Sequence, residues 1–184
     1  VGTHSMSDFS AWENAAVYED FVGESSVREW PRFDGKVTLR SPAARVDFQS
    51  VSVCVDEENA NFRIETVGTI PAREGDDPYW MNLMIKPANS LYTDAYGYSY
   101  VINRDADNIL AVDKNGEYKT VGKAEIAYNN NVMLISVPLS AIGLTKENCF
   151  MDFKVADDFG NNVMDFYSEG DCMPVGRLSY RFGY

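Results

Sequence analysis

The sequence predicts an all-β fold, an antiparallel β-sandwich of the immunoglobulin or jelly-roll type with about ten short strands and little helix. Apolar and polar residues alternate along several short segments, which is the pattern of half-buried strands. Clusters of Asp, Asn and Gly separate these segments, as turns do. Helical signals are scarce, and residues 138–144 predict a single turn that ends at Gly143. Frequent turns without long helices favour a sandwich over βαβ units.

Strand signals dominate the chain after its first quarter. Apolar residues of one parity predict strands in three segments, residues 81–85, 133–139 and 151–155. Between residues 46 and 55 the apolar parity switches after Phe48, which predicts a β-bulge or a sharp bend in a long strand. Residues 177–184 alternate most regularly and predict a closing strand, whereas residues 23–35 are polar and less regular.

Length predicts one domain, because 184 residues suffice for a single sizeable core. Residues 1–6 have the character of an expression-tag remnant, which leaves residues 7–184 as the domain. The remnant holds His4, the sole histidine, so His-based triads and His-ligated metal sites are not expected. No apolar run approaches the roughly 20 residues of a membrane helix, so membrane insertion is not expected.

The net charge of −12 argues against nucleic acid as a partner, because the phosphate backbone would be repelled. A neutral ligand and a monomeric state are expected instead. The three cysteines, Cys54, Cys149 and Cys172, lie far apart and form no C-x-x-C pair. A disulfide between two of them is left open.

Enzymatic motifs are missing from the sequence, and we expect no catalytic activity. It contains no G-x-S-x-G, H-E-x-x-H, G-x-G-x-x-G or P-loop pattern that would identify a nucleophile or a phosphate site. Sugar hydrolysis needs two carboxylates across a cleft, but with 28 acidic residues some pair always meets that condition.

Aromatic side chains suited to stacking on sugar rings are numerous, with planar polar groups beside them. The candidate ligand-binding residues are Trp30, Arg45, Asp47, Trp80, Tyr92, Tyr96, Tyr98 and Asn103. Packing offers an alternative for several of them, since Trp80 adjoins a strand and loop tyrosines also cap the ends of sandwiches. Arg45 and Asp47 could equally form a structural polar network with Asn103 and Arg104.

Oxygen donors are densest between residues 157 and 171, where Ca²⁺ coordination is one interpretation. The candidate metal ligands are Asp157, Asp158, Asn161, Asp165 and Asp171. The alternative is a set of turns, because Asp, Asn and Gly clusters mostly form turns and the spacing differs from that of an EF-hand loop. Residues 57–59 form a weaker second cluster.

Six stretches carry a resemblance to a known group: residues 12–21, 45–66, 78–85, 98–104, 137–144 and 153–180. Through them the chain resembles the family 9 carbohydrate-binding modules and their DOMON-like β-sandwich relatives. The resemblance implies a non-catalytic module that targets a secreted or cell-surface bacterial glycan-degrading protein to polysaccharide. It also implies a structural Ca²⁺ and catalytic domains, such as glycoside hydrolases, in the same parent chain.

Two other functions compete with carbohydrate binding. A structural accessory or interaction domain of a multidomain extracellular protein would pack on a neighbour and bind no sugar. A DOMON-like heme or redox domain is disfavoured, because axial ligation by Met and His needs a histidine and the only one lies in the tag remnant.

Overall fold

The computed structural model describes residues 12–183, so the expected tag remnant lies outside the described part. The described residues form an all-β fold of fourteen antiparallel strands with short 3₁₀ helices, which confirms the predicted fold class. The strands outnumber the predicted ten because several have only three or four residues, too few to show clear alternation. No helix among the described residues is long and apolar enough to cross a membrane.

One sheet has five strands in the order β1-β4-β5-β11-β10. Their bounds are β1 Ala16–Glu19, β4 Phe48–Val55, β5 Asn59–Thr66, β11 Val132–Pro138 and β10 Glu125–Asn129. The register of β4 against β5 shifts between Phe48 and Ser50, which confirms the predicted bulge.

The second sheet has seven strands, ordered β13-β12-β6-β7-β8-β9, with β14 paired to β12. Their bounds are β13 Asp171–Met173, β12 Met151–Asp157, β6 Asn82–Pro87, β7 Tyr100–Ile102, β8 Asn108–Val112, β9 Tyr118–Lys123 and β14 Tyr180–Phe182. Strand β14 is the predicted closing strand, shortened at both ends. The predicted single turn is η2, Leu139–Ile142, which Gly143 ends in the left-handed conformation at φ 70°.

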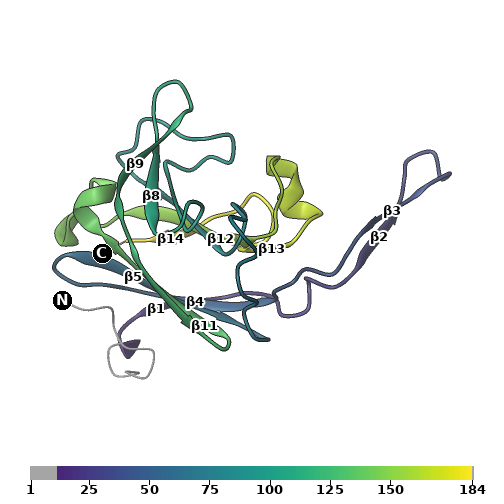
Figure 1. Ribbon diagram of the computed structural model, residues 1–184, viewed down its shortest axis with the longest axis horizontal. Helices are drawn as coiled ribbons and strands as arrows, with labels where there is room; N and C mark the ends of the chain where they lie inside the picture. Colours follow the sequence, from purple (N-terminus) through teal and green to yellow (C-terminus); the bar gives the residue numbers. More distant parts are fainter. Residues whose placement is uncertain (1–11, 184) are drawn as a thin grey trace.

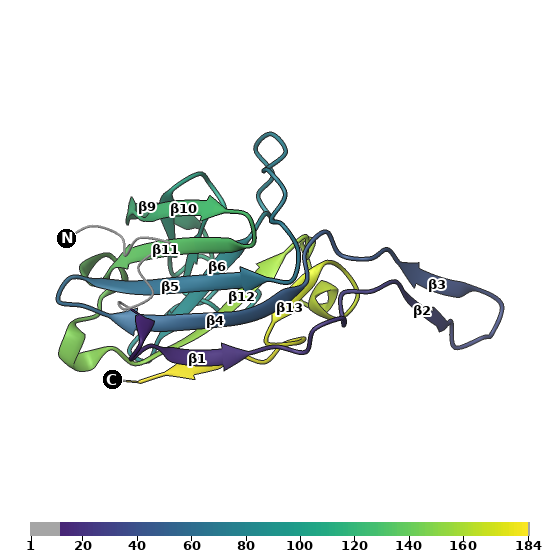
Figure 2. The same ribbon diagram turned by 90° about the horizontal axis from the view of Figure 1, so that it is seen from below.

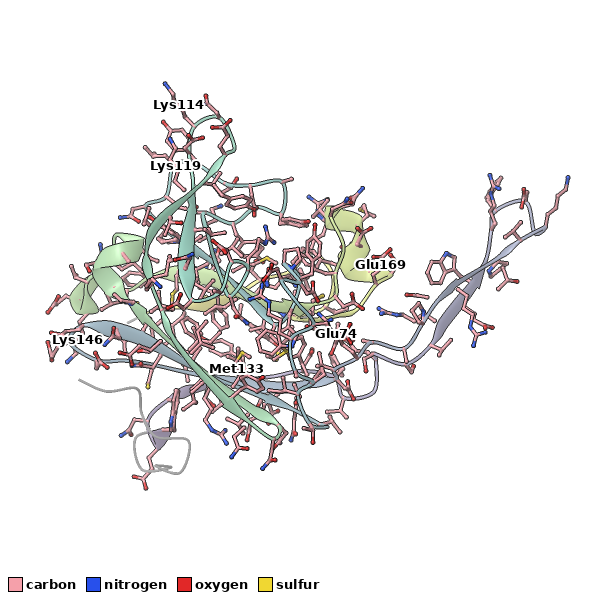
Figure 3. All side chains as sticks on the ribbon, viewed as in Figure 1. Glu74, Lys114, Lys119, Met133, Lys146 and Glu169 are labelled. Carbon is pink, nitrogen blue, oxygen red and sulfur yellow. The ribbon has the colours of Figure 1, made fainter. Side chains whose placement is uncertain are left out.

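Both sheets contribute to one apolar core, so the arrangement is sandwich-like (Figures 1 and 2). The ring of Phe62 on β5 lies 5.5 Å from that of Phe153 on β12, and Tyr18 on β1 meets Phe153 edge-on at 5.1 Å. Met133 of β11 is fully buried in the same core (Figure 3). Alternation along the strands places these residues on the inner faces.

A second apolar cluster covers the outer face of the seven-stranded sheet. Met84, Val101 and Ala156 belong to it, and their strand neighbours of opposite parity belong to the main core. Phe159 and Phe166 stack on each other with centroids 5.2 Å apart above this face. The segment that follows β12, including η4 Val163–Tyr167, is thereby packed against the sheet.

A hairpin of two strands, β2 Arg28–Pro31 and β3 Thr38–Ser41, forms a separate sheet. Residues 28–41, here called the arm, project away from the two larger sheets (Figures 1 and 2). Trp30 pairs with Leu39 in its register. The segment that looked irregular in the sequence therefore includes strand β2 and the turn of an extended hairpin.

Candidate functional site

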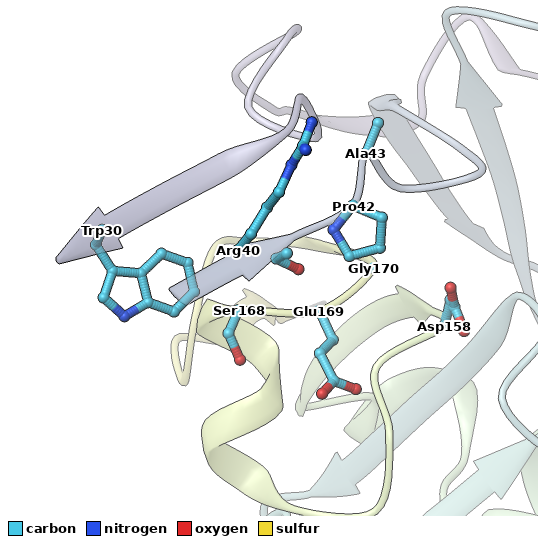
Figure 4. Close-up of a pocket in the computed structure, with 9 residues that line it drawn as sticks. Trp30, Arg40, Pro42, Ala43, Asp158, Ser168, Glu169 and Gly170 are labelled. Atoms are coloured by element: carbon cyan, nitrogen blue, oxygen red, sulfur yellow. The ribbon is translucent and has the colours of Figure 1, made fainter. Parts of the chain in front are cut away.

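The base of the arm carries a pocket of about 440 Å³, within the range of about 300–1,000 Å³ usual for small-ligand sites. We call it the arm-base pocket. The arm and the residues just after it form one wall, and the segment after β12 forms the other (Figure 4). Its lining residues are Trp30, Arg40, Ser41, Pro42, Ala43, Asp158, Ser168, Glu169 and Gly170.

Hydrogen bonds from Arg28 hold the two walls together. Its guanidinium donates to the carbonyl of Gly170 at 2.6 Å and to that of Tyr167 at 3.5 Å. Gly170 has φ 52°, and a Cβ there would lie 1.9 Å from the carbonyl oxygen of Asp157. Only glycine fits this position, so the close approach of the two ends of the loop between β12 and β13, which forms this wall, depends on it.

Aromatic and charged groups meet in this pocket. Trp30 is 37% exposed, while the carboxylates of Asp158 and Glu169 lie across from the arm (Figure 4). Arg40 pairs with Glu29 at 3.1 Å on the exposed arm. Arg40 and Glu29 pair on the face of the hairpin opposite to Trp30, so the Arg40 guanidinium points away from the pocket (Figure 4). The exposed indole, with the carboxylates and the hydroxyl of Ser168 on the other wall, can stack on an apolar ring face and hydrogen-bond to hydroxyl groups.

Of the eight predicted ligand-binding residues, only Trp30 and Tyr92 are exposed. Tyr92, 48% exposed, lies in a different pocket of about 260 Å³, lined partly by Leu91, Tyr100 and Gly143. The two pockets share no residue. The structure therefore does not bring the predicted aromatic residues together into one surface.

Three of the predicted ligand residues are buried and structurally engaged. Trp80 packs in the core and donates its indole N–H to the carbonyl of Pro71 at 3.0 Å. Tyr98 is 2% exposed, with its hydroxyl 2.6 Å from that of Ser179. Asn103 donates its amide to the carbonyls of Trp80 and Met81. Buried side chains offer no face to a sugar, so these three are excluded as contacts.

Tyr96 and Arg104 belong to a second structural group. The Tyr96 hydroxyl donates to the carbonyl of Gly160 at 3.0 Å, and its ring packs on Phe159 and Phe166. Arg104 donates to the side-chain oxygen of Asn82 at 3.1 Å and lies over several aromatic rings, among them Tyr96 at 5.7 Å. Both side chains hold loops onto the outer face of the sheet.

Arg45 forms the structural network that was the alternative to ligand binding, but with other partners. Its guanidinium binds the buried carboxylate of Asp157 at 2.7 and 3.0 Å and Asp77 at 2.8 Å. Asn103 and Arg104, the partners expected from the sequence, take no part in these bonds. Asp47 instead accepts hydrogen bonds from the amide of Gly23 at 3.0 and 3.1 Å.

The predicted metal ligands are dispersed by the fold. Asp157 is engaged by Arg45, Asp158 lines the arm-base pocket, and Asn161 is exposed. Asp165 accepts from the amide of Asn162 in the capping box of η4. Of the five, only Asp171 joins a group of carboxylates with metal-ligand spacing among the described residues.

That group, here called the acidic cluster, consists of Asp20, Glu24 and Asp171, with one oxygen from each within 4.8 Å of the others. Asp171 is buried and accepts from the amides of Phe48 at 2.7 Å and Cys172 at 2.9 Å. The Oδ2 atom of Asp20 is buried without a hydrogen-bond partner among the described residues. Carboxylate oxygens are the ligands that Ca²⁺ prefers.

The pKa values of the acidic cluster are shifted first by burial and second by repulsion between the carboxylates. Burial, with the charges of Asp20 and Asp171, raises the pKa of Glu24 to about 7. Burial also raises the pKa of Asp171 to about 6. Lys154, fully buried nearby, donates to the carbonyl of Pro174, and its charge lowers the pKa of Asp20 against the net upward effect of burial. A bound cation would relieve this repulsion.

The acidic cluster escapes sequence reasoning because Asp20 and Glu24 are some 150 residues from Asp171. The three cysteines are free thiols in the structure, which resolves the disulfide left open by the sequence. Comparisons of this chain with family models, with curated proteins and with solved structures find no match.

Proposed function

We propose that this chain is a non-catalytic carbohydrate-binding module whose arm-base pocket holds a sugar of a polysaccharide. The observation that carries the proposal is the exposed indole of Trp30 in a pocket of suitable size that Asp158 and Glu169 line from the other wall. The resemblance of the sequence to carbohydrate-binding modules supports the same function.

Binding would rest on stacking and hydrogen bonds without bond making or breaking. The indole of Trp30 would lie against the C–H face of a pyranose ring. The carboxylates of Asp158 and Glu169 would accept hydrogen bonds from sugar hydroxyls, and the hydroxyl of Ser168 could donate or accept. Such a shallow site supports modest affinity, because ordering and desolvation costs offset much of the gain.

The Ca²⁺ implied by the resemblance fits the acidic cluster better than the residues expected from the sequence. The unpartnered Oδ2 of Asp20 and three carboxylates within 4.8 Å match the oxygen donors that Ca²⁺ takes. When bound, the ion would supply positive charge that holds the segment after β1 to β13. Because β13 begins directly after Gly170, this would also steady one wall of the arm-base pocket.

The biological setting of the proposal follows from the resemblance alone. We infer that the module belongs to a secreted or cell-surface bacterial protein and that catalytic domains in the same parent chain act on the polysaccharide. The module itself would supply attachment.

Affinity gels loaded with a panel of polysaccharides, followed by calorimetry on those that retard the protein, test the proposal. We expect Trp30→Ala to weaken binding about tenfold or more, because a stacked ring contributes on the order of 1 kcal/mol or more. Tyr92→Ala is the matched control and should bind as the original chain does, because Tyr92 lies in the other pocket.

Loss of binding in Tyr92→Ala with retention in Trp30→Ala would move the site to the other pocket. A folded chain that binds no glycan would overturn the proposal and favour the accessory domain. The exposed apolar residues of the arm, Phe33 above all, are the observation that favours that second function.

A further inference from the structure

The arm has almost no packing of its own. Every side chain from residue 29 to residue 38 is exposed, and Phe33 at the turn is 107% exposed. Figure 3 shows the side chains of the arm standing clear of the two large sheets. An isolated two-stranded hairpin is at best marginally stable in water, so an arm of this length is expected to be covered by a partner.

Charge distinguishes the arm from the rest of the chain. Residues 28–41 hold four basic and two acidic residues, a net charge of +2, which leaves −14 for the remainder of a chain whose total is −12. Within the arm, Glu29 pairs with Arg40 and Asp34 lies 4.0 Å from Arg32. Lys36 makes no ion pair with any described residue, so its charge is available at the turn.

The segment before the arm has the complementary character. Residues 13–27, here called the base segment, carry four carboxylates and no basic residue. Asp20 and Glu24 belong to the acidic cluster, so Glu13 and Glu19 are the carboxylates that the segment exposes. The same segment exposes Val17 by 60%, Phe21 by 78% and Val22 by 57%. Within one copy the arm points away from the base segment, so the two surfaces cannot meet there (Figure 2).

We propose that the arm binds the base segment of a second copy of this chain, in a two-fold symmetric dimer. In such an interface each contact occurs twice, because the turn of each arm reaches the base segment of the other copy. Phe33 and Val37 would pack on the exposed apolar residues of the base segment, while Lys36 would face the carboxylate of Glu19. Within each copy the turn lies about seven extended residues, roughly 23 Å, from the start of the arm, which gives the arm its reach.

A dimer of this kind would not depend on glycan binding, and it differs from the monomer expected from the sequence. A polysaccharide offers no negative charge to the arm unless it is itself acidic, whereas a second copy offers both the carboxylates and the apolar side chains. The chain thus carries complementary surfaces at the two ends of one continuous segment, as a self-complementary interface requires.

Sedimentation equilibrium of the full chain and of charge-reversal variants, over a range of concentrations, tests the dimer. We expect Lys36→Glu and Glu19→Lys each to weaken dimerisation about tenfold or more, because each places like charges together twice per dimer. An equimolar mixture of the two variants should restore association, since both contacts in the mixed dimer are attractive. Lys114→Glu, an exposed lysine on the β8–β9 turn (Figure 3), is the matched control and should leave the dimer unchanged.

Phe33→Ser should shift the chain to monomer with unchanged thermal unfolding of the monomer, since this side chain touches little in its own copy. A full chain that stays monomeric up to high concentration would overturn the proposal. So would a dimer that tolerates both Phe33→Ser and Lys36→Glu, because another face would then form it.

Discussion

At the scale of single residues, Arg45 shows how a polar side chain that suits a binding site can instead be structural. Its partner Asp157 has a fully buried side chain that also accepts from the amide of Met81 at 2.8 Å. A buried carboxylate without a cation costs far more than an exposed one. The bidentate geometry of a guanidinium explains why arginine occupies this position.

Replacing Arg45 with alanine should destabilise the fold by about 3–5 kcal/mol, because Asp157 would stay buried without its partner. Urea denaturation measures the change. Arg181→Ala is the control, since Arg181 pairs with Asp152 in similar geometry but is 81% exposed, and exposed pairs contribute about 1 kcal/mol or less. An equal decrease of the free energy of unfolding in the two variants would contradict the structural role assigned to Arg45.

At the scale of elements, the acidic cluster joins parts of the chain that share no strand pairing. Asp20 and Glu24 follow β1 in the five-stranded sheet, whereas Asp171 begins β13 in the seven-stranded sheet. Like charges at this junction push the two elements apart unless they bind protons or a cation. The junction therefore couples the two sheets at the edge that carries the arm.

Without a cation, the chain should lose stability as the pH rises from about 5 to about 8. The pKa values of Glu24 and Asp171, about 7 and about 6, lie above their ordinary 4.5 and 3.8, so the folded state binds more protons than the unfolded state in this window. Millimolar Ca²⁺ should raise the melting temperature at about pH 8 and much less at about pH 5, where protons compete.

Glu24→Gln should abolish most of the rise in melting temperature that Ca²⁺ causes. Glu58→Gln, which changes an exposed carboxylate on the β4–β5 turn, should leave that rise unchanged. Calorimetric scans with chelator and with Ca²⁺ supply both comparisons. If Ca²⁺ does not change the melting temperature of the original chain, the acidic cluster is excluded as a cation site.

At the scale of the whole molecule, stability depends on the contact between the inner faces of the two sheets. Phe153 sits at its centre, with Phe62 and Tyr18 of the opposite sheet within 5.5 Å between ring centroids. Burial of large rings on both faces dominates such a core. The arm projects from it, and none of the arm's described side chains belongs to this core.

Phe153→Ala should lower the free energy of unfolding by about 3–5 kcal/mol, since the side chain is fully buried and leaves a cavity between the sheets. Leu91→Ala, at 85% exposure, should change it by no more than about 0.5 kcal/mol. Denaturant unfolding followed by tryptophan fluorescence compares the two. If Phe153→Ala lowers the free energy of unfolding only slightly, the packing of the two sheets against each other does not determine stability.

Several features could be predicted from the sequence because they depend on neighbours in the chain. Alternation predicted the strands and hence the fold class, the change of parity after Phe48 predicted the bulge, and Gly143 predicted the end of η2. Trp30 was among the candidate ligand-binding residues of the sequence, and it lines the arm-base pocket.

Only the tertiary structure decided which polar groups meet. Asp171 joins Asp20 and Glu24 rather than its own neighbours, and Arg45 pairs with Asp77 and Asp157 rather than with Asn103 and Arg104. Periodicity reports which face a side chain occupies, but contacts between distant segments depend on sheet order and loop path. The arm was missed for the same reason, since its strands pair only with each other and residues 29–38 are exposed on both faces, so alternation gives no signal there.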